Sequence, residues 1–315
     1  MDNITRCSCC ERCHPGIDLV NHTSQVGIDA SPSGYKILFP VDFSSRSALA
    51  AQHVKMWSDR FSAVLNTLHI VEGNQNGLWY DQSRYSEQSR VVARRTADLE
   101  YFSHHHFGEN EAQVFVLAGN TADRLEAFAN HEQVDLVMLP RNHHSVMARI
   151  FNESLTANLL DRCRASVWMT EHIRQNQGAT VKSVLCALHF KQDQLLHAQN
   201  LRILHTVRQL VSNFGADVTF LQVTGNTKPT ESWTEAGTEA GSQLWLMQAQ
   251  DLLGGSIRLL CKPGSVISGI RDTVAQISAD LVVVGRIRPE AITFGRQSRI
   301  LKIDHVVRCP VLSVW

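Results

Sequence analysis

The sequence predicts an α/β protein made of two tandem, doubly wound domains, each built on a five-stranded parallel sheet. Short apolar runs, suited to strands that are buried on both faces, alternate with helical segments. The same order of runs occurs twice, and nearly the same number of residues separates Asp42 from Asp135 as separates His189 from Asp280. Such a repeat indicates a duplicated domain. The predicted boundaries are a Cys-rich tail at 1–33, domains at 34–173 and 181–315, and a linker at 174–180.

The first copy contains five apolar runs that predict strands. Ser44 and Ser45 follow the first run and predict a helix N-terminus, because a serine hydroxyl can accept a bond from a free N–H there. The turn at Gly119 and Asn120 predicts the start of another helix. Strands separated by helices indicate a parallel sheet. The expected strands are 37–41, 63–71, 114–117, 136–139 and 167–169.

The second copy repeats this order after the linker. A stretch rich in Thr, Glu and Gly, Gly225 to Ser242, predicts a surface loop between its second and third strands. The expected strands of this copy are 184–188, 218–223, 257–260, 281–284 and 311–314.

Composition narrows the classes of function. The chain has 315 residues, 43% of them hydrophobic, and its 30 Lys and Arg balance its 30 Asp and Glu. Zero net charge argues against nucleic acid or an anionic membrane as a partner, since both attract basic surfaces. We find no apolar run long enough to span a bilayer and no apolar core of a signal peptide. We therefore expect a cytoplasmic protein whose partner is a protein that the sequence does not identify.

Four motifs in a fixed order carry a family resemblance. Asp42 ends the first strand, Leu68-His69-Ile70 lies in the second, Asp280 to Gly285 forms a fourth, and Cys309-Pro310-Val311 leads into a fifth. In this order they resemble the universal stress protein family over about residues 34 to 315. The resemblance implies an adenine nucleotide alpha hydrolase-like fold and a role in the stress response. It also implies that the two fifth strands pair to form an intrachain pseudo-dimer, while a homodimer of whole chains stays open.

The resemblance further implies an ATP site with the pattern G-x2-G-x9-G-(S/T) after the fourth strand. Glycines let the backbone approach the phosphates, and free N–H groups at a helix N-terminus bind the anion. In the first copy the pattern falls on Pro140, His143, Glu153 and Ser154, so all three glycines are absent. Asp42, the expected partner of the base or ribose, is present. We expect this domain not to bind ATP in the family's manner.

The second copy keeps more of the pattern. Gly285 and Ser298 match it, whereas Arg288 and Gln297 replace the other glycines and His189 stands in place of the aspartate. Arginines gather in this stretch, and arginine can bind phosphate through its side chain. They form either a solvated surface or a site for ATP, AMP or phosphate. The candidate nucleotide-binding residues of the chain are Asp42, Gly285, Arg286, Arg288 and Ser298.

Cysteines are concentrated in the N-terminal tail. One interpretation is a tail with accessible thiols, and another is a zinc site, because thiolates and imidazole are preferred zinc ligands. A third is the haem c pattern C-x-x-C-H, which normally requires export. The candidate metal ligands are Cys7, Cys9, Cys10, Cys13 and His14. We expect the remaining four cysteines, which fall in or beside predicted helices and strands, to be buried: Cys163, Cys186, Cys261 and Cys309.

Nothing in the sequence favours an enzyme. It lacks a nucleophile elbow, paired carboxylates at a telling spacing and an intact phosphate loop. The run His104 to His106 does not suggest a metal site, because consecutive residues on a helix point about 100° apart. The sequence therefore predicts a non-enzymatic regulatory stress protein with degenerate nucleotide sites. The alternatives are a nucleotide- or phosphate-binding module in the second domain and a redox or zinc sensor in the tail.

Overall fold

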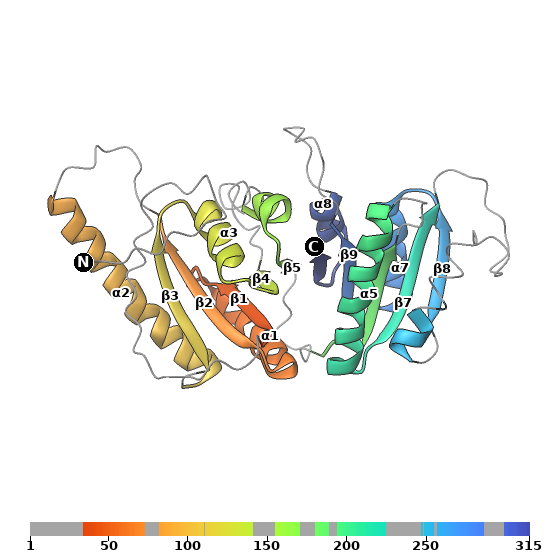
Figure 1. The fold of residues 1–315 in the computed structure, drawn as a ribbon, viewed down its shortest axis with the longest axis horizontal. Coiled ribbons are helices and arrows are strands. Elements are labelled where there is room, and N and C mark those ends of the chain that lie inside the picture. The colour runs from red at the N-terminus through yellow and green to blue at the C-terminus, as the bar shows by residue number, and fades with distance from the viewer. Residues whose placement is uncertain are drawn as a thin grey trace, which may run out of the picture. The chain divides into compact units, whose positions relative to one another are not determined.

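The described residues all belong to one compact unit, Gly34–Trp315 (Figure 1). In this computed structural model they are residues 34–72, 82–109, 111–140, 155–170, 180–188, 194–224, 247, 249–254, 257–286 and 299–315.

The first half has the predicted alternation of strands and helices. Residues 155–162 are also helical. The elements are β1 (Lys36–Pro40), α1 (Ser45–Phe61), β2 (Val64–Val71), α2 (Gln82–Phe107), β3 (Ala112–Ala118), α3 (Thr121–His131), β4 (Leu136–Pro140) and β5 (Ser166–Thr170).

The second half repeats the strand order, and its third strand runs to residue 263, beyond the predicted 257–260. Its elements are β6 (Ser183–Leu188), α5 (Gln194–Phe214), β7 (Asp217–Thr224), β8 (Arg258–Pro263), α7 (Val266–Ile277), β9 (Leu281–Gly285), α8 (Arg299–Val306) and β10 (Val311–Val314). The predicted loop at 225–242 lies outside the described residues.

Within the described residues, ten strands form one sheet, in the order β3-β2-β1-β4-β5-β10-β9-β6-β7-β8. The pairs within each half are parallel. β5 and β10 pair antiparallel, with Leu312 opposite Trp168. The predicted fold class is therefore confirmed, with the two five-stranded sheets joined through their fifth strands. The exact domain limits stay predictions, and the linker at 174–180 is described only at Thr180.

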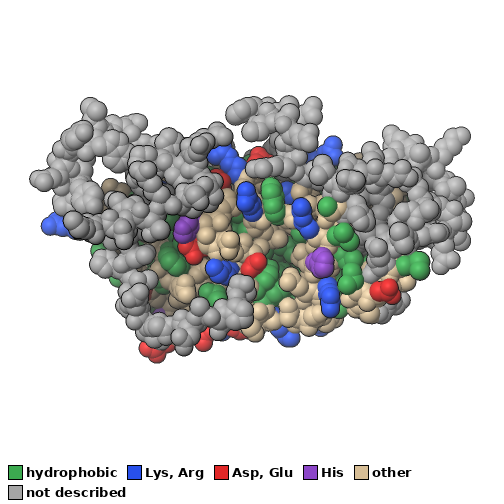
Figure 2. All heavy atoms as spheres, viewed as in Figure 1, with side chains coloured by type: hydrophobic (Ala, Val, Ile, Leu, Met, Phe, Trp, Pro, Cys, Tyr) green, Lys and Arg blue, Asp and Glu red, His purple; other side chains and the backbone are tan. Residues whose placement is uncertain are grey.

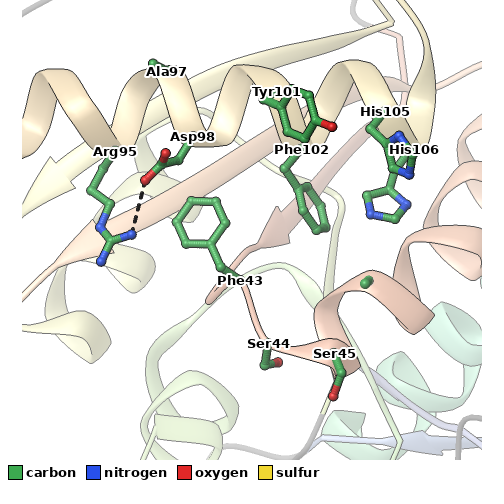
Figure 3. A pocket seen from close by; sticks show the side chains of 11 residues that line it. Phe43, Ser44, Ser45, Arg95, Ala97, Asp98, Tyr101, Phe102, His105 and His106 are labelled. Atoms are coloured by element: carbon green, nitrogen blue, oxygen red, sulfur yellow. Dashed lines mark hydrogen bonds and ion pairs between the residues drawn. The ribbon is translucent and has the colours of Figure 1, made fainter.

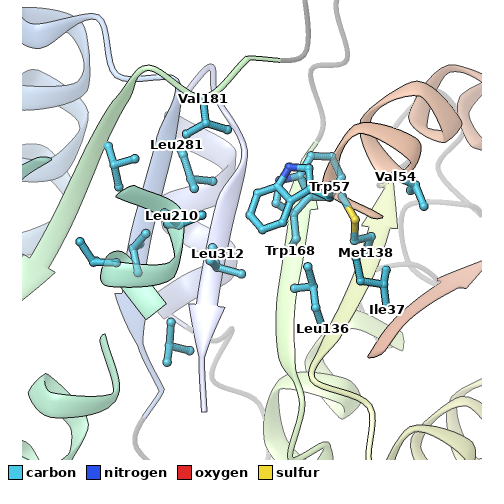
Figure 4. Packing of buried hydrophobic residues seen from close by; sticks show 14 of the residues in the cluster. Ile37, Val54, Trp57, Leu136, Met138, Trp168, Val181, Leu210, Leu281 and Leu312 are labelled. Carbon is cyan, nitrogen blue, oxygen red and sulfur yellow. The ribbon is translucent and has the colours of Figure 1, made fainter. Parts of the chain in front are cut away.

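Alternate strand residues point to opposite faces, and helices cover both faces. Ile37 and Phe39 of β1 pack in one hydrophobic cluster with α1, α2 and α5. Leu38, between them, packs with α3 and residues 155–165 on the other face. The first cluster includes residues of both halves, among them Trp168 and Leu312 (Figure 4). The core is therefore continuous across the junction of β5 and β10.

Helices α1 and α5 add a second contact between the halves. Trp57 and Phe61 of α1 lie with ring centroids 5.3 and 5.9 Å from Phe214 of α5. Arg60 donates a hydrogen bond to the carbonyl of Asn213 at 3.2 Å. Aromatic pairs at such distances add to the stabilisation from buried area.

The predicted helix starts are confirmed in the first half. Ser44 is the N-cap of α1, and its hydroxyl accepts from the backbone N–H of Ser47 at 3.3 Å. Asn120 caps α3 in the same way after the turn at Gly119, which has a φ of 140°. Both caps follow the carboxyl end of a strand. In open α/β sheets this is the edge at which ligands bind.

Candidate functional site

Asp42 follows β1 at the carboxyl edge of the sheet, as predicted, and is bonded within its own turn. Its Oδ1 accepts from the backbone N–H of Ser44 at 2.9 Å and from the hydroxyl of Ser47 at 2.6 Å. Loss of water contact alone would raise the pKa of Asp42, but these hydrogen bonds outweigh it and lower the pKa below its ordinary value. The geometry gives Asp42 a role in fixing the start of α1.

Phe43 and His69 lie next to this aspartate. His69, on β2, contacts the carbonyl of Val41 through Nδ1 at 2.7 Å, and its ring centroid is 4.6 Å from that of Phe43. A carbonyl only accepts, so Nδ1 carries the proton. Burial, opposed by this hydrogen bond and assisted by nearby Arg95, lowers the pKa of His69. His69 therefore supports the loop after β1 as a neutral ring.

β4 ends at Pro140, where the first glycine of the family pattern would stand. Proline has no backbone N–H, so this position cannot donate to a phosphate. The other three positions of the pattern in this half lie outside the described residues. The expectation that this half does not bind ATP in the family's manner therefore stays a prediction.

Gly285 ends β9, and its side-chain position is occupied by Gln199 of α5. A Cβ atom built on Gly285 would lie 2.6 Å from Cγ and 2.9 Å from Nε2 of Gln199. Gln199 is buried, and its Nε2 donates to the carbonyl of Val314 at 2.9 Å. Glycine is therefore required here to accommodate a side chain of the protein itself.

Arg286, a candidate phosphate ligand, is 5% exposed and contacts the first half of the chain. Its guanidinium donates to the carbonyls of Leu159 at 3.1 Å and Ala165 at 2.6 Å. The same group lies 4.9 Å from the ring of Trp315, and burial lowers the pKa of Arg286 to about 10. Arg286 stays a cation at neutral pH, and these contacts make it part of the joint between the halves.

Several candidate residues lie outside the described residues, and their predicted roles stay predictions. They are the nucleotide candidates Arg288 and Ser298 and the metal candidates Cys7, Cys9, Cys10, Cys13 and His14. Within the part of the chain that the structure describes, no group of three or more His, Cys, Asp or Glu is placed to hold a metal ion.

The remaining cysteines correct one expectation. Cys163, Cys186 and Cys309 are buried as predicted, and burial raises the pKa of each thiol. Cys261 is exposed, so the prediction was wrong for this residue. It lies on β8, which is an edge strand of the sheet and has a neighbouring strand on one side only.

Two residues that the sequence analysis did not single out shape these strand ends. Gln199 lies in the second turn of an amphipathic helix, and nothing in the local pattern places it against residue 285. Phe43 has a φ of 59°, in the left-handed region that bulky residues rarely adopt. No local sequence signal reveals either feature, because each depends on contacts with segments far along the chain.

The described surface carries mixed charge. Basic, acidic and hydrophobic side chains are interspersed across the face shown in Figure 2. Among the described helices, none is both long enough and apolar enough to cross a membrane.

Comparison with known proteins identifies the first half by sequence. Residues 35–171 match the model of the Universal stress protein family. A comparison with curated proteins gave no match.

Comparison with solved structures extends the likeness to both halves. The chain is similar to a universal stress protein from Archaeoglobus fulgidus DSM 4304, with a TM-score of 0.62 and 15% identity over 90% of this chain and 96% of that one. A putative universal stress protein from Pseudomonas aeruginosa UCBPP-PA14 gives 0.55 and 12%, over 89% and 92%. The cytoplasmic domain of a prokaryotic cation chloride cotransporter gives 0.50 and 12%, over 89% and 95%. Identities this low show a shared fold alone.

Proposed function

We propose that this chain is a non-enzymatic regulatory protein of the stress response with degenerate nucleotide sites, on the basis of the match of residues 35–171 to the Universal stress protein family model. The observation that carries the proposal is that the two residues kept from the family pattern, Asp42 and Gly285, make close contacts within the chain, although Asp42 itself is exposed. Asp42 is bonded to Ser44 and Ser47, and the space beside Gly285 holds Gln199.

Phosphate binding at these strand ends would need backbone or side-chain donors. Pro140 supplies no N–H, and the guanidinium of Arg286 donates to Leu159 and Ala165. A phosphate at Arg286 would have to replace two hydrogen bonds of a buried cation, and losing such bonds is costly. This argument favours weak or absent nucleotide binding in both halves.

The pKa of Asp42 also supports the proposal that the protein is not an enzyme. A general base works best with a pKa near the working pH, whereas hydrogen bonds lower the pKa of Asp42. The match of residues 35–171 to the family model and the core that runs through both halves suit a protein that acts by binding a partner. We place it in the cytoplasm as an intrachain pseudo-dimer, with a protein partner that its surface does not identify.

Equilibrium dialysis of the full chain with labelled ATP and AMP tests the proposal. We expect no saturable binding below about 1 mM, the level at which an interaction contributes only about 4 kcal/mol. Native mass spectrometry of the purified protein should likewise show no retained nucleotide. Micromolar binding that weakens in D42A, or release of phosphate from ATP above the rate of a protein-free control, would overturn it.

A further inference from the structure

A pocket of about 510 Å³ opens between the first turn of α1 and helix α2 (Figure 3). Its lining comes entirely from residues 43–48 and 95–106, so it includes neither Pro140 nor Gly285. Pockets of this size accept small organic molecules, and they usually combine apolar walls with a few polar groups. This pocket is therefore a candidate site separate from the ends of β4 and β9.

Aromatic rings form its apolar wall. Phe43 projects toward α2, and Phe102 and His106 project from α2 on the same side (Figure 3). The rings of Phe43 and Phe102 are 6.3 Å apart at 81°, and those of Phe102 and His106 are 4.4 Å apart. Offset and edge-to-face arrangements of this kind are the ones that aromatic ligands also adopt. The wall suits a flat ring.

The backbone of Phe43 indicates that its ring is held in this position against a conformational cost. Its φ of 59° lies in the left-handed region, which a bulky residue occupies only where surrounding contacts hold it. Such residues gather at ligand sites more often than elsewhere. The contacts of the Phe43 ring with the rings of His69 and Phe102 stabilise this conformation.

The charged side chains of the pocket lining are one arginine, Arg95, and one aspartate, Asp98. The guanidinium of Arg95 lies 5.5 Å from the centre of the Phe43 ring, and its NH1 atom is 3.2 Å from Asp98 Oδ2. Burial and the neighbouring His105 lower the pKa of His106, which favours its neutral form. A carboxylate can form paired hydrogen bonds with the planar guanidinium of Arg95, which lies beside the Phe43 ring.

We propose that this pocket binds a small aromatic carboxylate, with the ring against Phe43 and Phe102 and the carboxylate on Arg95. Asp98 then competes with the ligand for the same guanidinium. The two residues are exposed to a similar extent, with side-chain exposures of 44% and 41%, so the pair can open at little cost. The inference goes beyond the proposed function and does not depend on whether nucleotides bind.

Isothermal titration of the full chain with indole-3-acetate and its uncharged analogue indole-3-acetamide tests the proposal. We expect the acid to bind at least about tenfold more tightly than the amide, the ratio typical of one charge-assisted pair. R95Q should weaken the acid about tenfold and leave the amide unchanged. D98N should strengthen the acid, because it removes the competing carboxylate.

Arg90 provides the matched control, since it is an exposed arginine of the same helix that does not line the pocket. R90Q should bind the acid as the unmodified protein does. Equal binding of acid and amide, equal loss in R90Q and R95Q, or no saturation with indole-3-acetate or 4-hydroxybenzoate up to about 10 mM would refute the proposal. AMP binding that is lost in R95Q, without binding of either acid, would refute it in favour of a nucleotide.

Discussion

Replacing Gly285 by alanine tests whether this glycine serves packing or a ligand. The added Cβ would lie 2.6 Å from Cγ of Gln199, a distance that real Cβ atoms do not show. Cγ is close to the helix backbone, so the whole Gln199 side chain must move and lose its bond to Val314. Overpacking a core costs about 1–3 kcal/mol and the lost hydrogen bond about 1 kcal/mol. We expect G285A to lower the free energy of unfolding by about 2–4 kcal/mol.

Shortening Gln199 in the same protein isolates the clash. Q199A alone should cost about 1–2 kcal/mol, because the Val314 carbonyl keeps its second donor, the N–H of Arg286 at 2.9 Å. In the Q199A background the three nearest atoms to an added Cβ at 285 are gone, so the alanine should be nearly neutral. The double-mutant cycle should therefore show a coupling of about 2–4 kcal/mol.

Urea unfolding followed by far-ultraviolet circular dichroism measures all four proteins without any ligand. G34A is the matched control, since a Cβ there would lie 3.9 Å from the Val64 side chain, an ordinary contact. Additive effects within about 0.5 kcal/mol would show that Gln199 does not determine the need for glycine. A fully stable G285A would show the same, and it would return Gly285 to the list of candidate ligand-binding positions.

Three further outcomes follow from the described contacts. F43G should be at least as stable as F43A in urea, because only glycine adopts the positive φ of residue 43 without strain. Elsewhere glycine usually costs about 0.5–1 kcal/mol more than alanine. A less stable F43G would show that the backbone at residue 43 is not strained. R286K should lower stability by about 1–3 kcal/mol, since one ammonium cannot replace a planar fork that bonds both Leu159 and Ala165, and unchanged urea midpoints would contradict this. D42N should be less stable than the parent at pH 7. Because folding lowers the pKa of Asp42, that difference is complete above its unfolded value near 4 and fades as pH falls through its lower folded value; a difference that does not shrink as the pH falls below about 4 would have another cause.

The order of elements was predictable because it depends on local patterns. Apolar runs such as 281–284 are buried strands, and Ser44 lies where a helix needs an acceptor. The pairing of β5 with β10 was implied by the family resemblance rather than by these patterns, and it is present. The duplication strengthens the fold prediction, because a strand or helix assigned wrongly in one copy would disagree with the corresponding segment of the other copy.

Side-chain destinations were less predictable because they depend on long-range packing. Arg286 sits among other arginines in the sequence and resembles a solvated residue, yet it is buried against a helix 120 or more residues earlier. Cys261 lies in an apolar run and resembles a core residue, yet the run forms an edge strand. In both cases the local pattern predicts the secondary-structure element correctly, but it does not predict which other elements pack against it.

The contacts at the end of β9 connect the nucleotide question to the joint between the halves. The carbonyl of Val314 accepts from the backbone of Arg286 and from Gln199, and the side chain of Arg286 continues to Leu159 and Ala165. A phosphate entering beside Gly285 would have to displace Gln199 and compete for Arg286. Ligand binding there would therefore weaken the attachment of the second half to the first. A site of this kind would bind tightly only if the ligand replaced the hydrogen bonds that it broke.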